Sequence, residues 1–165
     1  MRVLTYRIPW GNAGARATVR RMRQLVRDAE ADPWTVHAAY RIVEDTRDPE
    51  GMHRLIRAFL AGYVEHYPDP VGHELIRAPR TMLQRIQSQG WAEGDCDDVA
   101  TLGAALGKAL GLPARFVLLS FSPRGPFSHV YTELGTGCCW RELDTSAPAH
   151  LPEGLTIHRT ETHEA

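Results

Sequence analysis

The chain has 165 residues, a formal net charge of -1, and 43% hydrophobic and 24% charged residues. At this length a single domain buries about two thirds of its unfolded surface, so it needs neither disulfides nor a structural metal. The balanced charge argues against electrostatic binding to nucleic acid. Arginines crowd residues 16–27, but a charge run on one helix face is normally solvated. We therefore expect an ordinary soluble globular domain with no nucleic-acid partner.

The number of cysteines and the distribution of apolar residues indicate the cellular compartment of the protein. The three cysteines are an odd number and include no C-x-x-C motif, so a disulfide framework is not indicated. Residues 1–10 hold no continuous apolar run of seven or more residues, which excludes a standard signal peptide. No stretch approaches the roughly eighteen apolar residues that a membrane helix requires. These features predict a cytoplasmic protein, or one released from a cytosol, with no membrane partner.

The first half of the chain has helical periodicity, after a short predicted strand at Val3–Ile8. An apolar stripe runs from Val19 to Ala29 with the spacing of one helix face. Asp32-Pro33 is typical of a helix N-cap followed by a first-turn proline. Asp48-Pro49 repeats this signal ahead of a strongly apolar face at residues 52–63. The pattern predicts three helices before residue 66.

A proline-rich stretch separates these helices from the second half. Residues 67–80 contain three prolines and a glycine, which predicts an ordered loop. Residues 81–89 favour one more short helix. From Gly90 onward, the small apolar residues of 100–110 predict a helix that ends at Gly111, a suitable C-cap. Its small side chains suit burial against a sheet.

The remaining chain has strand character. Three segments rich in β-branched and aromatic residues are expected to be strands, namely 115–121, 128–134 and 140–143. Residues 135–137 predict a hairpin turn between the last two. From Ala147 the chain is polar, which predicts an irregular tail. Helices followed by an antiparallel sheet give an α+β fold.

Three widely separated residues form a candidate catalytic site. Cys96 precedes the small-residue helix, where free N–H groups and the helix dipole stabilise a thiolate. His129 begins one predicted strand and Asp144 ends the next. If these strands pair through the turn at 135–137, the histidine and the aspartate lie at the same end. Asp144 can then orient the imidazole while its other nitrogen faces the thiol.

Each of these residues has an ordinary structural interpretation when taken alone. A single cysteine is usually a small buried hydrophobe, a strand histidine is usually a satisfied core or surface group, and an aspartate before Thr145 is usually a turn residue. Only their joint arrangement favours catalysis. Ser128 is an alternative nucleophile, but no G-x-S-x-G motif surrounds it.

Two clusters raise the question of a metal. Asp95, Asp97 and Asp98 are carboxylates, yet they lack the glycine-centred spacing of a Ca²⁺ loop and stand where a helix begins. Asp95 and Asp98 are therefore interpreted as helix-capping residues that support the site. Cys138 and Cys139 are adjacent, unlike the C-x₂₋₄-C spacing of zinc sites. We expect no metal.

The motifs around the three candidate residues resemble the core of the transglutaminase-like superfamily. The resemblance is carried by Gly94–Ala100, Ala109–Val117, Ser128–Glu133 and Trp140–Thr145. It covers roughly residues 90–146 and implies Cys96 as nucleophile, His129 as general base and acid, and Asp144 as orienting residue. It also implies a papain-like core, in which the nucleophile helix packs on an antiparallel sheet. Residues 69–79 resemble a segment of transglutaminase-like proteins encoded by tailed phages and prophages.

The resemblance also implies the domain boundaries and further residues of the site. One domain over residues 1–165 is expected, with a helical part at 13–89, a catalytic core at 90–146 and a tail at 147–165. The backbone N–H of Cys96 is one candidate donor to the oxyanion hole, and Gln89 or Trp91 is a candidate for the second. The nucleophile, base and orienting residue are all protein groups, so no cofactor is expected.

These features predict acyl transfer through a thioester on Cys96, with a protein or peptide as substrate. Animal transglutaminases carry an aromatic residue after the nucleophile, whereas Asp97 follows it here. This departure favours hydrolysis of an amide bond over transglutaminase-type transfer to an amine. The alternative is a phage structural or assembly protein with an idle or self-processing triad. Its partners would then be phage structural proteins, and it would be found in the virion rather than in the cytoplasm of a bacterial host.

Overall fold

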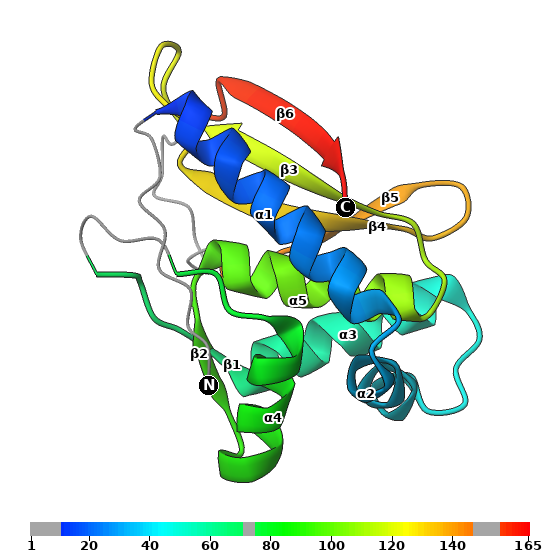
Figure 1. Cartoon of the computed structure of the whole chain (residues 1–165). Helices are drawn as coiled ribbons and strands as arrows, with labels where there is room; N and C mark the ends of the chain where they lie inside the picture. The colour runs from blue at the N-terminus through cyan, green and yellow to red at the C-terminus, as the bar shows by residue number, and fades with distance from the viewer. Residues whose placement is uncertain (1–10, 71–74, 147–155) are drawn as a thin grey trace.

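The computed structural model describes residues 11–70, 75–146 and 156–165 (Figure 1). In chain order its elements are α1 (Asn12–Glu30), α2 (Pro33–Val43), α3 (Pro49–Tyr63), β1 (Val64–His66), α4 (Pro79–Gln89), β2 (Ala92–Gly94), α5 (Cys96–Ala109), β3 (Ala114–Ser120), β4 (His129–Gly135), β5 (Trp140–Leu143) and β6 (Arg159–Glu164). The predicted strand at Val3–Ile8 lies outside the described residues.

The helices of the first half start where their capping residues indicate. The Asp32 side chain accepts a hydrogen bond from the Thr35 N–H at 3.0 Å, and Asp48 accepts one from the Gly51 N–H at 2.8 Å. Each cap is followed by a first-turn proline. The three helices predicted before residue 66 are confirmed. Helix α4 begins at Pro79, two residues earlier than predicted, because that proline also occupies a first turn.

A four-stranded antiparallel sheet in the order β5-β4-β3-β6 forms the second half. The three predicted strands are confirmed within about one residue at each end, and Leu119 pairs with His129 while Thr132 pairs with Leu143. The hairpin turn lies slightly later than predicted, since Gly135 still belongs to β4. The Thr136 N–H donates to the Cys139 carbonyl at 2.9 Å and closes this turn.

Two parts of the sheet structure were not predicted from the sequence. Residues after Ala147 were expected to be irregular, but β6 pairs with β3 along the edge of the sheet. The prediction was wrong because β6 carries polar or charged residues at every position, so it has no apolar alternation to reveal it. The short parallel pair β1 and β2 was also missed, because three residues are too few to show a period.

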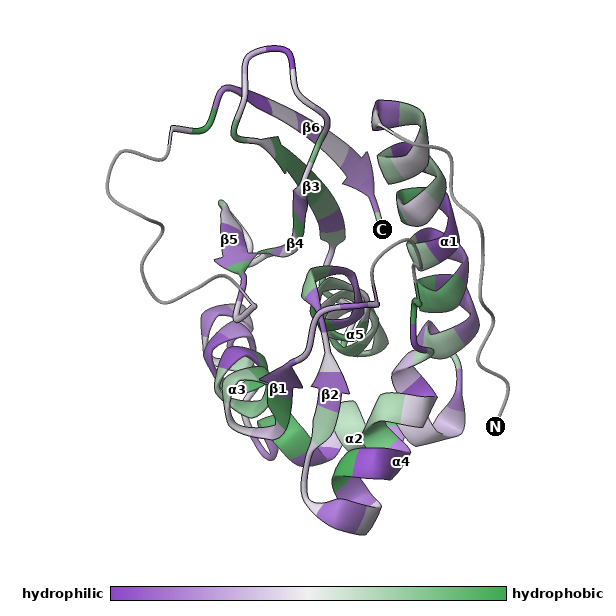
Figure 2. Cartoon of the chain, turned by 90° about the vertical axis from the view of Figure 1, so that its left-hand side faces the viewer, coloured by the Kyte–Doolittle hydropathy of each residue, from purple (hydrophilic) through white to green (hydrophobic). Residues whose placement is uncertain are grey.

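Helix α5 is the hydrophobic centre of the protein and lies between the sheet and the other helices (Figures 1 and 2). Its glycines permit close packing: a Cβ on Gly103 would lie 2.7 Å from the Leu143 side chain, and one on Gly107 would lie 2.5 Å from Leu134. The Thr132 hydroxyl donates to the Ala100 carbonyl at 2.7 Å. This packing fixes the start of α5 relative to β4. None of the described helices is long and apolar enough to cross a membrane.

Candidate active site

Cys96 is the first residue of α5, as predicted, and its side chain is partly exposed. Asp95 and Asp98 form a capping box around it, in which Asp98 Oδ2 accepts from the Asp95 N–H at 3.4 Å. The predicted capping role of both residues is thus confirmed. The first N–H groups of a helix have no partner within the helix, so their partial positive charge lies beside the sulfur.

His129 and Asp144 lie together at one end of the β4–β5 hairpin. His129 Nε2 is 2.6 Å from Asp144 Oδ2, and the two side chains are 14% and 7% exposed. The other carboxylate oxygen of Asp144 accepts from the N–H of Ser146 at 3.0 Å and from its hydroxyl at 2.9 Å. With both oxygens occupied, the carboxylate has a fixed orientation and holds the imidazole ring in turn.

The side chain of Cys96 is close enough to the His129 ring to contribute to its pKa. Because Asp144 occupies Nε2, Nδ1 is the ring nitrogen left for the sulfur. Burial lowers the pKa of His129, but the hydrogen bonds and charges of Asp144 and Cys96 outweigh it and raise this pKa to about 9. Burial likewise raises the pKa of Asp144, and the hydrogen bond and charge of His129 bring it below its ordinary value. A protonated imidazole beside the Asp144 carboxylate therefore fits the geometry.

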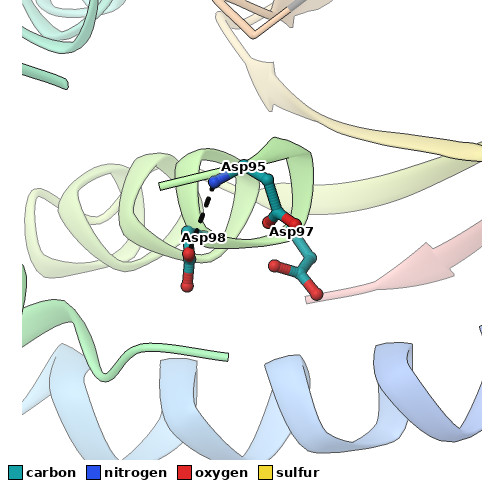
Figure 3. Close-up of side chains that lie close together, drawn as sticks. All are labelled: Asp95, Asp97 and Asp98. Atoms are coloured by element: carbon teal, nitrogen blue, oxygen red, sulfur yellow. Dashed lines mark hydrogen bonds between the residues drawn. The ribbon is translucent and has the colours of Figure 1, made fainter. Parts of the chain in front are cut away.

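The acidic cluster at the start of α5 separates into two environments (Figure 3). One oxygen from each of Asp95, Asp97 and Asp98 lies within 4.8 Å of the others. Asp95 and Asp97 lie side by side, and Asp98 points away from them. Burial, followed by the hydrogen bond with Asp95, raises the pKa of Asp97 well above its ordinary value. Both carboxylate oxygens of Asp98 already accept hydrogen bonds from a cationic residue.

That cation is Arg77, which the sequence did not single out. Its backbone N–H donates to Asp98 Oδ1 at 2.6 Å, and its guanidinium pairs with Asp98 Oδ2. The guanidinium is 13% exposed and also lies 3.7 Å from Glu93. Burial raises the pKa of Asp98 to about 7, although Arg77 lowers it. Arg77 thus ties the loop before α4 to the start of the nucleophile helix. Asp98 is 21 residues away in the chain, so no local pattern could have revealed this contact.

The two candidates for a second oxyanion donor lie on either side of the α4 C-cap. Gln89 is the last residue of α4, and its amide donates to the Trp91 carbonyl at 3.0 Å. Trp91 is 39% exposed and stands just before β2. These contacts explain how both residues are held, while an oxyanion role for either stays a prediction.

Comparisons with known proteins support the fold. A family model described as the transglutaminase-like superfamily matches residues 36–145. The structure is also similar to a crystal structure from Cytophaga hutchinsonii named a "putative cysteine protease" (TM-score 0.55, 22% identity). The match covers 86% of this chain and 47% of that one, so this chain spans about half of its length. No curated protein matches the chain. The predicted fold class is confirmed, and the resemblance of residues 69–79 to phage proteins stays a prediction.

Proposed function

Because the chain belongs to the transglutaminase-like superfamily, we propose that it is a cysteine enzyme that hydrolyses amide bonds through a thioester on Cys96. The observation that carries this proposal is the position of His129, whose ring lies 2.6 Å from the Asp144 carboxylate and is close enough to Cys96 for that residue to raise its pKa. These three side chains can be assigned as nucleophile, general base and acid, and orienting residue.

In the first step the Cys96 thiolate attacks the carbonyl carbon of the substrate. The helix N–H groups beside the sulfur, including that of Cys96, are suited to stabilise the oxyanion of the tetrahedral intermediate. A pKa of about 9 keeps His129 protonated at neutral pH. The imidazolium donates its proton to the leaving amine as the carbon–nitrogen bond breaks. The products are a thioester on Cys96, a free amine and a neutral imidazole.

In the second step His129 acts as a base. Part of the rise in its pKa comes from the hydrogen bond and charge of Cys96, and a thioester carries no such charge. Acylation therefore lowers the pKa of His129, while Asp144 keeps the ring in place. The neutral imidazole takes a proton from water, the hydroxide attacks the thioester, and the carboxylic acid leaves as the Cys96 thiolate and the imidazolium re-form.

Hydrolysis is proposed over transfer because Asp97 follows the nucleophile where animal transglutaminases carry an aromatic residue. The structure places Asp97 in a buried position, 2% exposed, beside Asp95. The residue after the proposed nucleophile is therefore a buried carboxyl group and not an aromatic side chain.

An activated ester tests the proposal without knowledge of the natural substrate. With p-nitrophenyl acetate, we expect acetyl-Cys96 to accumulate, as detected by mass spectrometry, and nitrophenol to be released over several turnovers. Cys96→Ala should abolish turnover. His129→Ala should reduce it by roughly 10²- to 10⁴-fold, the usual contribution of general acid–base catalysis. Adding glycine ethyl ester as an amine acceptor reports the balance between hydrolysis and transfer, and we expect acetate to remain the main product.

The matched control is Cys138→Ala, because Cys138 is exposed and can be acetylated without a base. Its turnover should equal that of the parent protein. Equal turnover in Cys96→Ala and the parent would contradict the proposal and favour the alternative of an idle triad in a phage assembly protein.

A further inference from the structure

The turn between β4 and β5 holds two cysteines that the proposed reaction does not use. Cys138 is exposed and Cys139 is partly exposed. Their sulfur atoms lie 3.2 Å apart. The pair stands at the opposite end of the hairpin from His129 and Asp144, since Gly135 pairs with Trp140 next to the turn. Two thiols this close and this accessible can both take part in thiol–disulfide exchange.

The turn is held in place by contacts on both sides of the pair. The Thr136 N–H donates to the Cys139 carbonyl at 2.9 Å, and Gly137 adopts a φ of 97° that a side chain would disfavour. Glu50, in the first turn of α3, accepts from the Thr136 hydroxyl and from Arg141 Nε, both at 2.8 Å. These contacts hold the two sulfurs next to each other in the reduced hairpin.

We propose that Cys138 and Cys139 form a redox couple, in which low-molecular-weight disulfides oxidise the two thiols to a disulfide between neighbouring residues. The Cys138 thiolate attacks one sulfur of the small disulfide and releases one small thiolate. The Cys139 thiolate then attacks the Cys138 sulfur of the mixed disulfide and releases the second. The two protons from the cysteines pass to these leaving groups, so two cysteine thiols are oxidised as one small disulfide is reduced to two thiols.

The geometry also predicts that this disulfide is easily reduced. Neighbouring Cα atoms are about 3.8 Å apart across a trans peptide, whereas unstrained disulfides span about 4.4–6.8 Å. The product ring is therefore strained, and strained, exposed disulfides are the labile ones. The couple is reversible under mild conditions, unlike a structural disulfide.

The two steps should differ in rate. The hydrogen bond with Cys139, followed by the charge of Cys139, raises the pKa of Cys138, so the first attack at neutral pH is slow. The second attack is intramolecular and benefits from a high effective concentration. We therefore expect little mixed disulfide to accumulate in the parent protein.

The experiment uses the full chain with oxidised glutathione at neutral pH, followed by iodoacetamide and trypsin. The tryptic peptide of residues 125–141 contains Cys138 and Cys139 but not Cys96. We expect this peptide to lose two hydrogen atoms and to carry neither glutathione nor alkyl groups. A low concentration of dithiothreitol should restore both thiols.

The matched variants are Cys139→Ser and Cys138→Ser, each of which leaves one thiol in the same turn. Removing the resolving thiol should raise the yield of glutathione adduct on the peptide by at least about tenfold. The proposal is overturned if the parent peptide keeps two alkylated cysteines under conditions that modify Cys96. It is also overturned if the parent accumulates the adduct as the variants do, or if oxidation only links two chains.

Discussion

Asp97 and Asp144 are both buried carboxyl groups close to Cys96, yet the structure places them in opposite electrostatic states. Asp144 has His129 at 2.6 Å and two hydrogen bonds from Ser146, and its pKa lies below the ordinary value. Asp97 has Asp95 beside it and, within the described residues, no salt-bridge partner, and burial raises its pKa. Burial disfavours the charge of both groups, so the partner decides which one ionises.

Asp98 lies between these extremes and supports the same conclusion. It is fully buried, and Arg77 compensates only part of the cost of its charge, so its pKa is about 7. One end of the site thus has a charged carboxylate that orients the His129 ring. The other has carboxyl groups that cap a helix and are partly neutral. Acidic residues beside a nucleophile need not act on it.

The largest effect on stability is expected from removing Arg77, the cation that pairs with Asp98. Arg77→Gln leaves a buried carboxylate without its partner, and breaking such a pair costs about 3–5 kcal/mol. Because Arg77 lowers the pKa of Asp98, the variant raises that pKa above 7, while the unfolded value stays near 3.8. Protonation relieves the penalty, so the loss of stability should be large at pH 8 and smaller at pH 5. Urea unfolding at both pH values measures it.

Arg85→Gln is the matched control, because Arg85 pairs with Glu93 at 2.8 Å in a more exposed setting, with side chains 26% and 31% exposed. Its loss should stay below about 1 kcal/mol at either pH. A loss in Arg77→Gln that is small, or independent of pH, would contradict the role assigned to the Arg77–Asp98 pair.

The next effect concerns His129. In Asp144→Asn the charge that favours the imidazolium is lost, so the pKa of His129 should fall from about 9 toward its ordinary value of 6.5. Each unit corresponds to about 1.4 kcal/mol. A raised histidine pKa stabilises the folded state below about 6.5 and loses this contribution as the pH rises through 9. NMR titration of the His129 ring measures the change, with Glu142→Gln, on the strand that precedes Asp144, as a control. An unchanged titration would refute the pairing.

The smallest effect is expected from Asp97→Asn, which replaces a carboxyl group of raised pKa by an amide of similar shape. A carboxyl whose folded pKa is raised costs stability as the pH rises above the unfolded value. The variant should therefore match the parent protein near pH 4 and exceed its stability by a growing margin toward pH 8. Thermal unfolding across this range measures the difference. If the variant is less stable at pH 8, Asp97 is ionised in the fold and has a partner.

The parts of the fold that the sequence revealed are those set by local chemistry. Asp32 and Asp48 cap helices through side-chain hydrogen bonds to the third residue after them, which is a short-range pattern. His129 and Asp144 could be placed together because a hairpin with a short turn sets the pairing of its strands. The identification of Cys96 as nucleophile depended on the family resemblance as well, since a cysteine alone indicates no function.

The parts of the fold that could not be predicted depend on contacts between residues far apart in the sequence. Strand β6 is polar along its length and is held by pairing with β3 at the sheet edge. Arg77 follows a proline-rich stretch and becomes important only when folding brings it to Asp98. The buried state of Asp97 likewise follows from packing rather than from its neighbours in the sequence. None of these three features produces a periodic pattern or a motif in the sequence from which it could be predicted.

The most direct test of the account is the rate at which each cysteine reacts with iodoacetamide at neutral pH, followed peptide by peptide. An imidazolium beside Cys96 should increase the reactivity of its sulfur, whereas the hydrogen bond with Cys139 keeps the pKa of Cys138 raised. We expect Cys96 to react at least about tenfold faster than Cys138 or Cys139, and to slow markedly in His129→Ala while the other two do not change. Equal rates for all three cysteines would contradict the proposed catalytic site. So would a Cys96 rate that is the same in His129→Ala as in the parent protein.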